Sequence, residues 1–136
     1  MTDTERSKSA FSAVRAIDYT VILARDWQAM RGFYEEVLGF PPRRELSQGW
    51  IEYRVGANTL ALAQPKRLAS DQPTPMGSAS VQLAFKVARE DVDHCAAELI
   101  NKGIALVEPP TDQPFGHRTL FFRDPDGNLL EVYAEI

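Results

Sequence analysis

Residues 124–131 read Asp-Pro-Asp-Gly-Asn-Leu-Leu-Glu, a tight turn that leads directly into a strand. Proline fixes φ early in such a turn and glycine supplies a positive φ, so the strand begins in a fixed register. With the two-residue period of a strand, one face carries Leu129, Glu131 and Tyr133, and the apolar residues between them lie on the other. The apolar face suits packing under a helix. Glu131 is therefore expected on the opposite, concave face, where a carboxylate needs a metal, a cation or hydrogen-bond donors.

The same order of elements occurs twice along the chain. Residues 56–58 (Gly-Ala-Asn) correspond to residues 126–128 (Asp-Gly-Asn), and a glycine ends a helical pattern in both 37–40 and 101–104. This duplication predicts two copies of a β-α-β-β-β module. One module cannot bury its own sheet, so the two sheets should curl around one cleft, within the chain or with a second subunit. The predicted fold class is α+β.

The module boundaries follow from the periodicity. We expect a loose N-terminal tail at residues 1–14 and one domain at 15–136, with modules at about 15–64 and 80–136 and a proline-containing linker between them. Strands are predicted at 17–23, 43–46, 50–55, 59–63, 81–87, 104–107, 117–123 and 129–136, and helices at 27–38 and 91–102. Strand 17–23 is rich in β-branched and aromatic residues, which predicts burial on both faces.

Composition limits the classes of partner. The chain has 136 residues, a net charge of -4 and a pI of about 5.2, which disfavours nucleic acid and anionic membranes. The single cysteine, Cys95, excludes an internal disulfide and a cysteine-based zinc site. No apolar run has the length of a membrane span, and no leader pattern opens the chain. A cytoplasmic location is the expectation.

Three segments resemble a known superfamily: residues 19–26, residues 33–40 (Phe-Tyr-Glu-Glu-Val-Leu-Gly-Phe) and residues 115–131. Together they look like the vicinal oxygen chelate superfamily, which includes glyoxalase I, bleomycin resistance proteins and extradiol dioxygenases. The resemblance implies a glyoxalase-like fold that binds a small molecule and pairs as a homodimer. It does not specify an activity, because this scaffold supports many chemistries.

The resemblance also implies a metal site at four cleft positions, which here hold Tyr19, Ala61, Gln82 and Glu131. Glu131 conforms to the family pattern, and Gln82 would be a weaker ligand through its amide oxygen. Tyr19 is an uncommon ligand and Ala61 cannot bind a metal. We therefore expect a degraded site that binds a divalent metal (Zn, Mn, Ni or Fe) weakly if at all.

Two further groups of residues are candidates for function. Tyr19 and Glu131 form a possible catalytic pair that abstracts a proton next to a carbonyl, or else a polar network that only orders the sheet. The residues predicted to contact a ligand are aromatic or polar side chains on strands or at loop ends: Trp50, Tyr53, Phe115, His117, Arg118 and Tyr133. His117 has an alternative role in bonding backbone at a loop end, and Arg118 has an alternative place in solvent.

The functional prediction has two main forms. The first is a small-molecule-binding protein, similar to bleomycin resistance proteins, with an incomplete metal site and an apolar or aromatic ligand. The second is a metal-dependent lyase, isomerase or dioxygenase of the same superfamily, in which Glu131, Gln82 and Tyr19 act on the substrate or its metal. A third alternative is a purely structural dimerisation domain, which would leave Glu131 unexplained.

Overall fold

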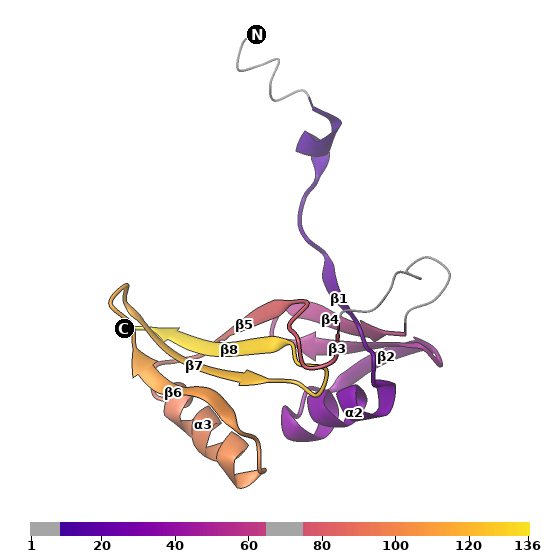
Figure 1. The fold of residues 1–136 in the computed structure, drawn as a ribbon. Coiled ribbons are helices and arrows are strands. Elements are labelled where there is room, and N and C mark those ends of the chain that lie inside the picture. Colours follow the sequence, from indigo (N-terminus) through magenta and orange to yellow (C-terminus); the bar gives the residue numbers. More distant parts are fainter. Residues whose placement is uncertain (1–8, 65–74) are drawn as a thin grey trace.

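The computed structural model describes residues 9–64 and 75–136 and contains two four-stranded sheets (Figure 1). The first sheet has the order β1-β4-β3-β2 and the second has the order β5-β8-β7-β6, so the predicted duplication and α+β class are confirmed. The strands are β1 (Tyr19–Leu23), β2 (Pro42–Ser47), β3 (Trp50–Val55), β4 (Asn58–Ala63), β5 (Gln82–Lys86), β6 (Leu106–Asp112), β7 (His117–Arg123) and β8 (Leu129–Glu135). In each sheet the first and last strands of the module pair in parallel, and the other neighbours are antiparallel.

The helices lie together on one side of the two sheets (Figure 1). They are α2 (Trp27–Gly32), which continues into the π-helical turn η2 (Phe33–Val37), and α3 (Asp91–Asn101). A short 3₁₀ helix, η1 (Ala10–Ala13), lies near the N-terminus of the described chain. None of the helices in the described residues has the length and apolar character needed to cross a membrane.

The first helix differs from the continuous α-helix predicted for 27–38. It begins as expected, with the Asp26 carboxylate accepting a hydrogen bond from the Ala29 N–H at 3.1 Å. After Gly32 the chain widens into η2, and the adjacent residues Phe33 and Tyr34 are both buried. A wider turn changes the angular spacing of neighbouring side chains, which allows both rings to enter the core. Packing of both rings in the core thus accounts for the departure from the α-helical spacing that the sequence predicted.

The core lies between the helices and the two sheets and is shared by both modules. Phe33 of η2 packs against Phe122 of β7 with ring centroids 6.3 Å apart, and Phe40 packs against Phe85 of β5 at 5.5 Å. These contacts cross from the first module to the second. The two sheets are therefore joined by a common hydrophobic layer on their helix side.

A polar network, the module clasp (Arg25, Tyr34, Asp124 and Asp126), also joins the modules. The buried Asp126 carboxylate accepts hydrogen bonds from the Arg25 N–H at 2.6 Å and from the Asp26 N–H at 3.1 Å. The Tyr34 O–H donates to the Asp124 carboxylate at 2.8 Å, and burial, reinforced by that carboxylate, raises the pKa of the phenol. The turn at 124–128 therefore holds the start of the first helix as well as setting the register of β8.

The side of the sheets away from the helices is open in the described residues. On β1, Tyr19, Val21 and Leu23 are exposed there, whereas Ile22 between them is buried. The prediction that this strand is buried on both faces is therefore wrong. Its apolar alternate residues belong to a concave face that the described residues leave uncovered.

Candidate functional site

The concave face of the second sheet forms a groove of about 560 Å³, here called the second-module groove. Strand pairing places Ala84 of β5 and Phe121 of β7 opposite Glu131 on either side of β8, and Thr119 opposite Tyr133. Side chains opposite one another in a sheet share a face. The lining residues are Ala84, Glu108, Gln113, Phe115, His117, Thr119, Phe121, Glu131 and Tyr133.

The groove contains two polar groups of side chains. The Gln82 amide donates a hydrogen bond to the Glu131 carboxylate at 3.3 Å. Nearer β6, the Gln113 amide donates to the Glu108 carboxylate at 3.1 Å and to the Thr119 hydroxyl at 3.0 Å. The lining residues thus supply two carboxylates but no lysine or arginine. Such a groove favours neutral or cationic ligands over anions.

Aromatic rings form the rest of the groove surface. The His117 imidazole stacks on the Tyr133 ring with centroids 4.7 Å apart and planes inclined by 27°. Phe115 meets the edge of His117 at 5.2 Å and is 70% exposed at the rim. A stacked pair with an exposed ring beside it offers a flat apolar surface to an aromatic ligand.

The structure brings four of the predicted ligand and catalytic residues into this groove: Phe115, His117, Glu131 and Tyr133. Tyr19 and Trp50 lie together on the first sheet, with ring centroids 6.0 Å apart. The Trp50 indole N–H donates to the Glu52 carboxylate at 2.9 Å. Neither residue lines the second-module groove.

Tyr53 and Arg118, both predicted to contact a ligand, lie on the helix side of their sheets. Tyr53 is fully buried in the core, and its O–H donates to the Glu35 carboxylate at 2.6 Å. Arg118 donates hydrogen bonds at 2.8 Å to Asp93 of α3 and to Asp112 of β6, and these bonds raise the pKa of the guanidinium. Both side chains stabilise the fold away from the groove.

Several groove residues were not among the predicted site residues. Phe121 and Thr119 share a face with His117 in β7, so the strand period was a sufficient signal for them. Glu108 lies within strand β6 and Gln113 directly follows it, whereas the strand was predicted to stop at residue 107. Nothing in the local sequence placed these two side chains in the groove.

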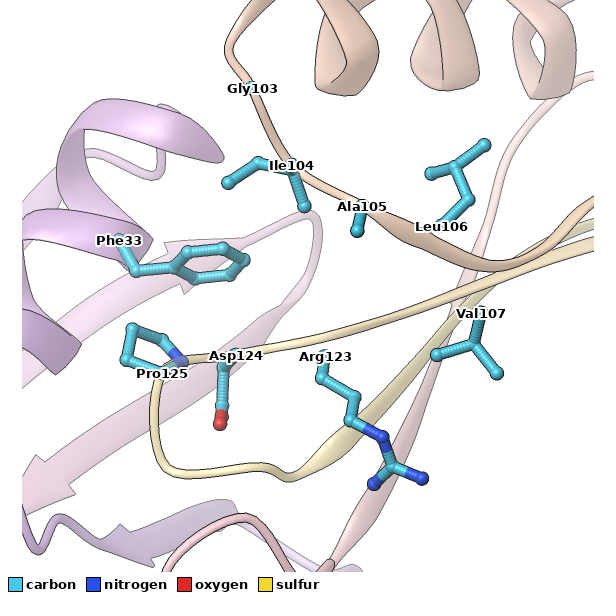
Figure 2. Close-up of a pocket in the computed structure, with 9 residues that line it drawn as sticks. All are labelled: Phe33, Gly103, Ile104, Ala105, Leu106, Val107, Arg123, Asp124 and Pro125. Carbon is cyan, nitrogen blue, oxygen red and sulfur yellow. The ribbon is translucent and has the colours of Figure 1, made fainter.

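A second hollow, of about 350 Å³, lies on the helix side between η2 and the chain that follows α3 (Figure 2). Phe33, Ile104 and Pro125 give it apolar walls. The Asp124 carboxylate beside it is already hydrogen-bonded to Tyr34 and Asn128. Arg123, whose guanidinium donates to the Gly127 carbonyl at 2.8 Å, also lines this hollow. Its lining includes a single aromatic ring, that of Phe33, so the second-module groove with its stacked rings is the better candidate site for an aromatic ligand.

Comparison with known proteins identifies the family. A sequence profile of the Glyoxalase/Bleomycin resistance protein/Dioxygenase superfamily matches residues 16–132. The chain belongs to this superfamily. A solved glyoxalase/bleomycin resistance protein/dioxygenase from Nocardioides has the same fold, with a TM-score of 0.82 over 98% of this chain and 90% of that one, at 19% identity.

Relatives of this superfamily member include a virulence protein, STM3117, from Salmonella typhimurium. It is 30% identical over 122 residues, covering 85% of this chain and 81% of that protein. Its crystal structure has a TM-score of 0.71, covering 90% of this chain and 98% of that one. The Bacillus subtilis protein YraH is 27% identical over 124 residues, covering 82% of this chain and 92% of YraH.

The superfamily often uses a divalent metal, and the residues of this member do not fit one. Of the four metal positions, Ala61 has no donor atom and the Tyr19 ring packs against Trp50. The remaining two, Gln82 and Glu131, are hydrogen-bonded to each other. The part of the chain that the structure describes contains no group of three His, Cys, Asp or Glu side chains placed to hold a metal ion. One carboxylate and one amide are too few protein ligands for tight binding.

Proposed function

We propose that the second-module groove binds an apolar or aromatic small molecule, with Glu131 receiving any cationic group that the molecule carries. The observation that carries this proposal is the His117–Tyr133 stack in the same groove as Glu131. The volume of about 560 Å³ suits a small ligand, since such sites span roughly 300–1,000 Å³. Bleomycin resistance, part of the superfamily's name, is consistent with a binding role that involves no turnover.

The preference for a cation follows from the partners of Glu131. Its carboxylate accepts a hydrogen bond from the neutral Gln82 amide at 3.3 Å. A protonated amine or ring nitrogen would supply a shorter, charge-assisted bond. Glu108 adds a second negative charge to the same groove.

Glu131→Gln tests the role of this carboxylate. We expect proflavine, a planar aromatic cation, to bind about fivefold more weakly to the variant, a loss of ~1 kcal/mol for one partly exposed charge. Acridine at mildly alkaline pH is flat and neutral, so its affinity should not change. Fluorescence titration measures both constants.

The matched control is Glu98→Gln, which removes the same charge from α3, where Glu98 pairs with Lys102 at 3.0 Å. This variant should bind proflavine as the wild type does. Equal proflavine affinities for wild type and Glu131→Gln would contradict the proposed role of Glu131.

A homodimer and a cytoplasmic location remain part of the proposal. Tyr19, Val21 and Leu23 expose apolar surface on the concave side, which a second copy could cover. A closed two-fold pair is the commonest arrangement for such a surface.

One observation favours the second candidate function, a metal-dependent lyase, isomerase or dioxygenase. Glu131 and Gln82 lie within hydrogen-bond distance on adjacent strands, and His117 lines the same groove. Metal analysis of the untagged protein, with melting shifts against Zn²⁺, Mn²⁺, Ni²⁺ and Fe²⁺, tests this alternative. Near-stoichiometric metal that is lost in Glu131→Ala would support the enzyme. Absence of both metal and shift is the result that we expect.

A further inference from the structure

The N-terminal arm (residues 9–18) stands away from the sheets, on the side opposite the helices (Figure 1). Hydrogen bonds within the arm give it local structure: the Ser12 N–H donates to the Ser9 carbonyl at 2.9 Å and the Val14 N–H to the Phe11 carbonyl at 3.0 Å. Its large apolar residues are nevertheless uncovered, with Phe11, Val14 and Ile17 exposed by 82%, 65% and 86%. Uncovered apolar side chains gathered on one segment indicate a contact with another molecule.

The apolar surface continues from the arm into the first sheet. Ile17 is followed at two-residue spacing by Tyr19, Val21 and Leu23, which are all exposed on the concave face. The buried Ile22 shows that this alternation is a property of the strand and not of fraying. The arm and β1 thus form one strip.

A second exposed apolar set lies on the rim of the second-module groove. Phe115 is at the turn before β7, and Ile136 ends the chain beside it, with its N–H donating to the Gly116 carbonyl at 3.0 Å. Phe115 also lines the groove, so the rim faces the concave side. The arm carries one cation, Arg15, and one carboxylate, Asp18, so it has no net charge and can approach the two carboxylates of the groove lining without repulsion of the whole segment. The two sets match in their exposed apolar character.

We propose that the N-terminal arm of one copy docks on the concave side of a second copy and covers the rim of its second-module groove. Phe11, Val14 and Ile17 then form a wall of the partner's ligand site. This inference rests on the homodimer proposed above and names the segment that builds it.

A second copy is the occupant favoured by symmetry. Each chain carries both an arm and a groove rim. A two-fold pair therefore buries the apolar residues of both arms and of both rims. An interface of standard size uses roughly 20–30 residues a side, and the arm and the β1 strip supply a large part of that number.

Sedimentation equilibrium on the full chain tests the arm, with Ile17→Asp as the variant. We expect a wild-type dimer and at least a tenfold rise in the dissociation constant for Ile17→Asp. Ile100→Asp is the matched control, because Ile100 is also an exposed isoleucine (60%) but lies on α3, on the helix side. It should leave the dissociation constant unchanged.

Sedimentation distinguishes the arm contact from dimerisation itself. A dimer that Ile17→Asp does not weaken would overturn the arm contact and leave the pairing intact, whereas a monomeric wild type would overturn both. The ligand site in the groove is tested separately, because the effect of Glu131→Gln on proflavine affinity can be measured for a monomer or a dimer.

Photo-cross-linking locates the contact. With p-benzoylphenylalanine in place of Phe11, irradiation should give a product of dimer mass whose cross-linked peptide contains Phe115 or Ile136. A product of monomer mass, or a cross-link to α3, would overturn the proposed docking site.

Discussion

Gly127→Ala is expected to lower the free energy of unfolding by ~4 kcal/mol, through backbone strain and a steric clash. Gly127 has φ +96°, in the region that residues with a side chain rarely adopt. A Cβ at this position would lie 2.5 Å from the carbonyl carbon of Gly77. Because the obstructing atoms are backbone atoms, no side-chain rotation relieves the clash.

The matched control is Gly56→Ala, at the corresponding turn of the first module. Gly56 has φ +57°, but nothing lies within 4 Å of its Cβ position. In that variant the free energy of unfolding should fall only by the backbone strain of alanine in a left-handed conformation, ~1 kcal/mol. Urea denaturation followed by circular dichroism measures both. Equal losses at the two glycines would show that the approach of Gly77 to the 124–128 turn contributes nothing.

Asp126→Ala is expected to cost ~3 kcal/mol, because it removes a buried acceptor from two backbone donors at once. The N–H groups of Arg25 and Asp26 would lose their carboxylate partner, and the Arg25 side chain, 3.8 Å from it, would lose an ion pair. These groups connect the second module to the start of α2. The expected result is therefore weaker attachment of one module to the other.

Asp112→Ala provides the comparison on the surface. Asp112 also pairs with an arginine, Arg118, at 2.8 Å, but its side chain is well exposed to solvent. Exposed ion pairs contribute about 0–1 kcal/mol. If Asp112→Ala and Asp126→Ala lowered the free energy of unfolding equally, the buried module clasp would stabilise the protein no more than an exposed ion pair does.

The parts of the fold that depend on local pattern could be predicted from the sequence. Turn residues and alternation in 124–131 set the register of β8, and they placed Glu131 and Tyr133 on the concave face and in the groove. The duplicated pattern predicted two similar modules, and the two sheets have the same strand order. Both inferences use interactions between residues close in sequence, where periodicity is informative.

The residues predicted to contact a ligand include neighbours that strand alternation places on opposite faces. Trp50 and Tyr53 are three residues apart in β3, and His117 and Arg118 are adjacent in β7, so the members of each pair must lie on opposite faces. Which member of each pair lies on the helix side depends on where the helices pack. The structure places Tyr53 and Arg118 on the helix side.

The module clasp could not be read from the sequence at all. Asp126 and Arg25 are 101 residues apart, and an aspartate in a turn is explained locally by the turn itself. Its second role, as acceptor for the start of α2, depends on how the two modules pack. The positions of Glu108 and Gln113 in the groove likewise depend on how the strands of the second sheet pair.

A ¹H–¹⁵N NMR titration of the wild-type protein with proflavine shows whether the second-module groove is the ligand site. Binding in this groove should give the largest chemical-shift changes on the amides of 117–121 and 131–133. Shifts concentrated at 103–107 and 123–125, around the hollow of Figure 2, would contradict it.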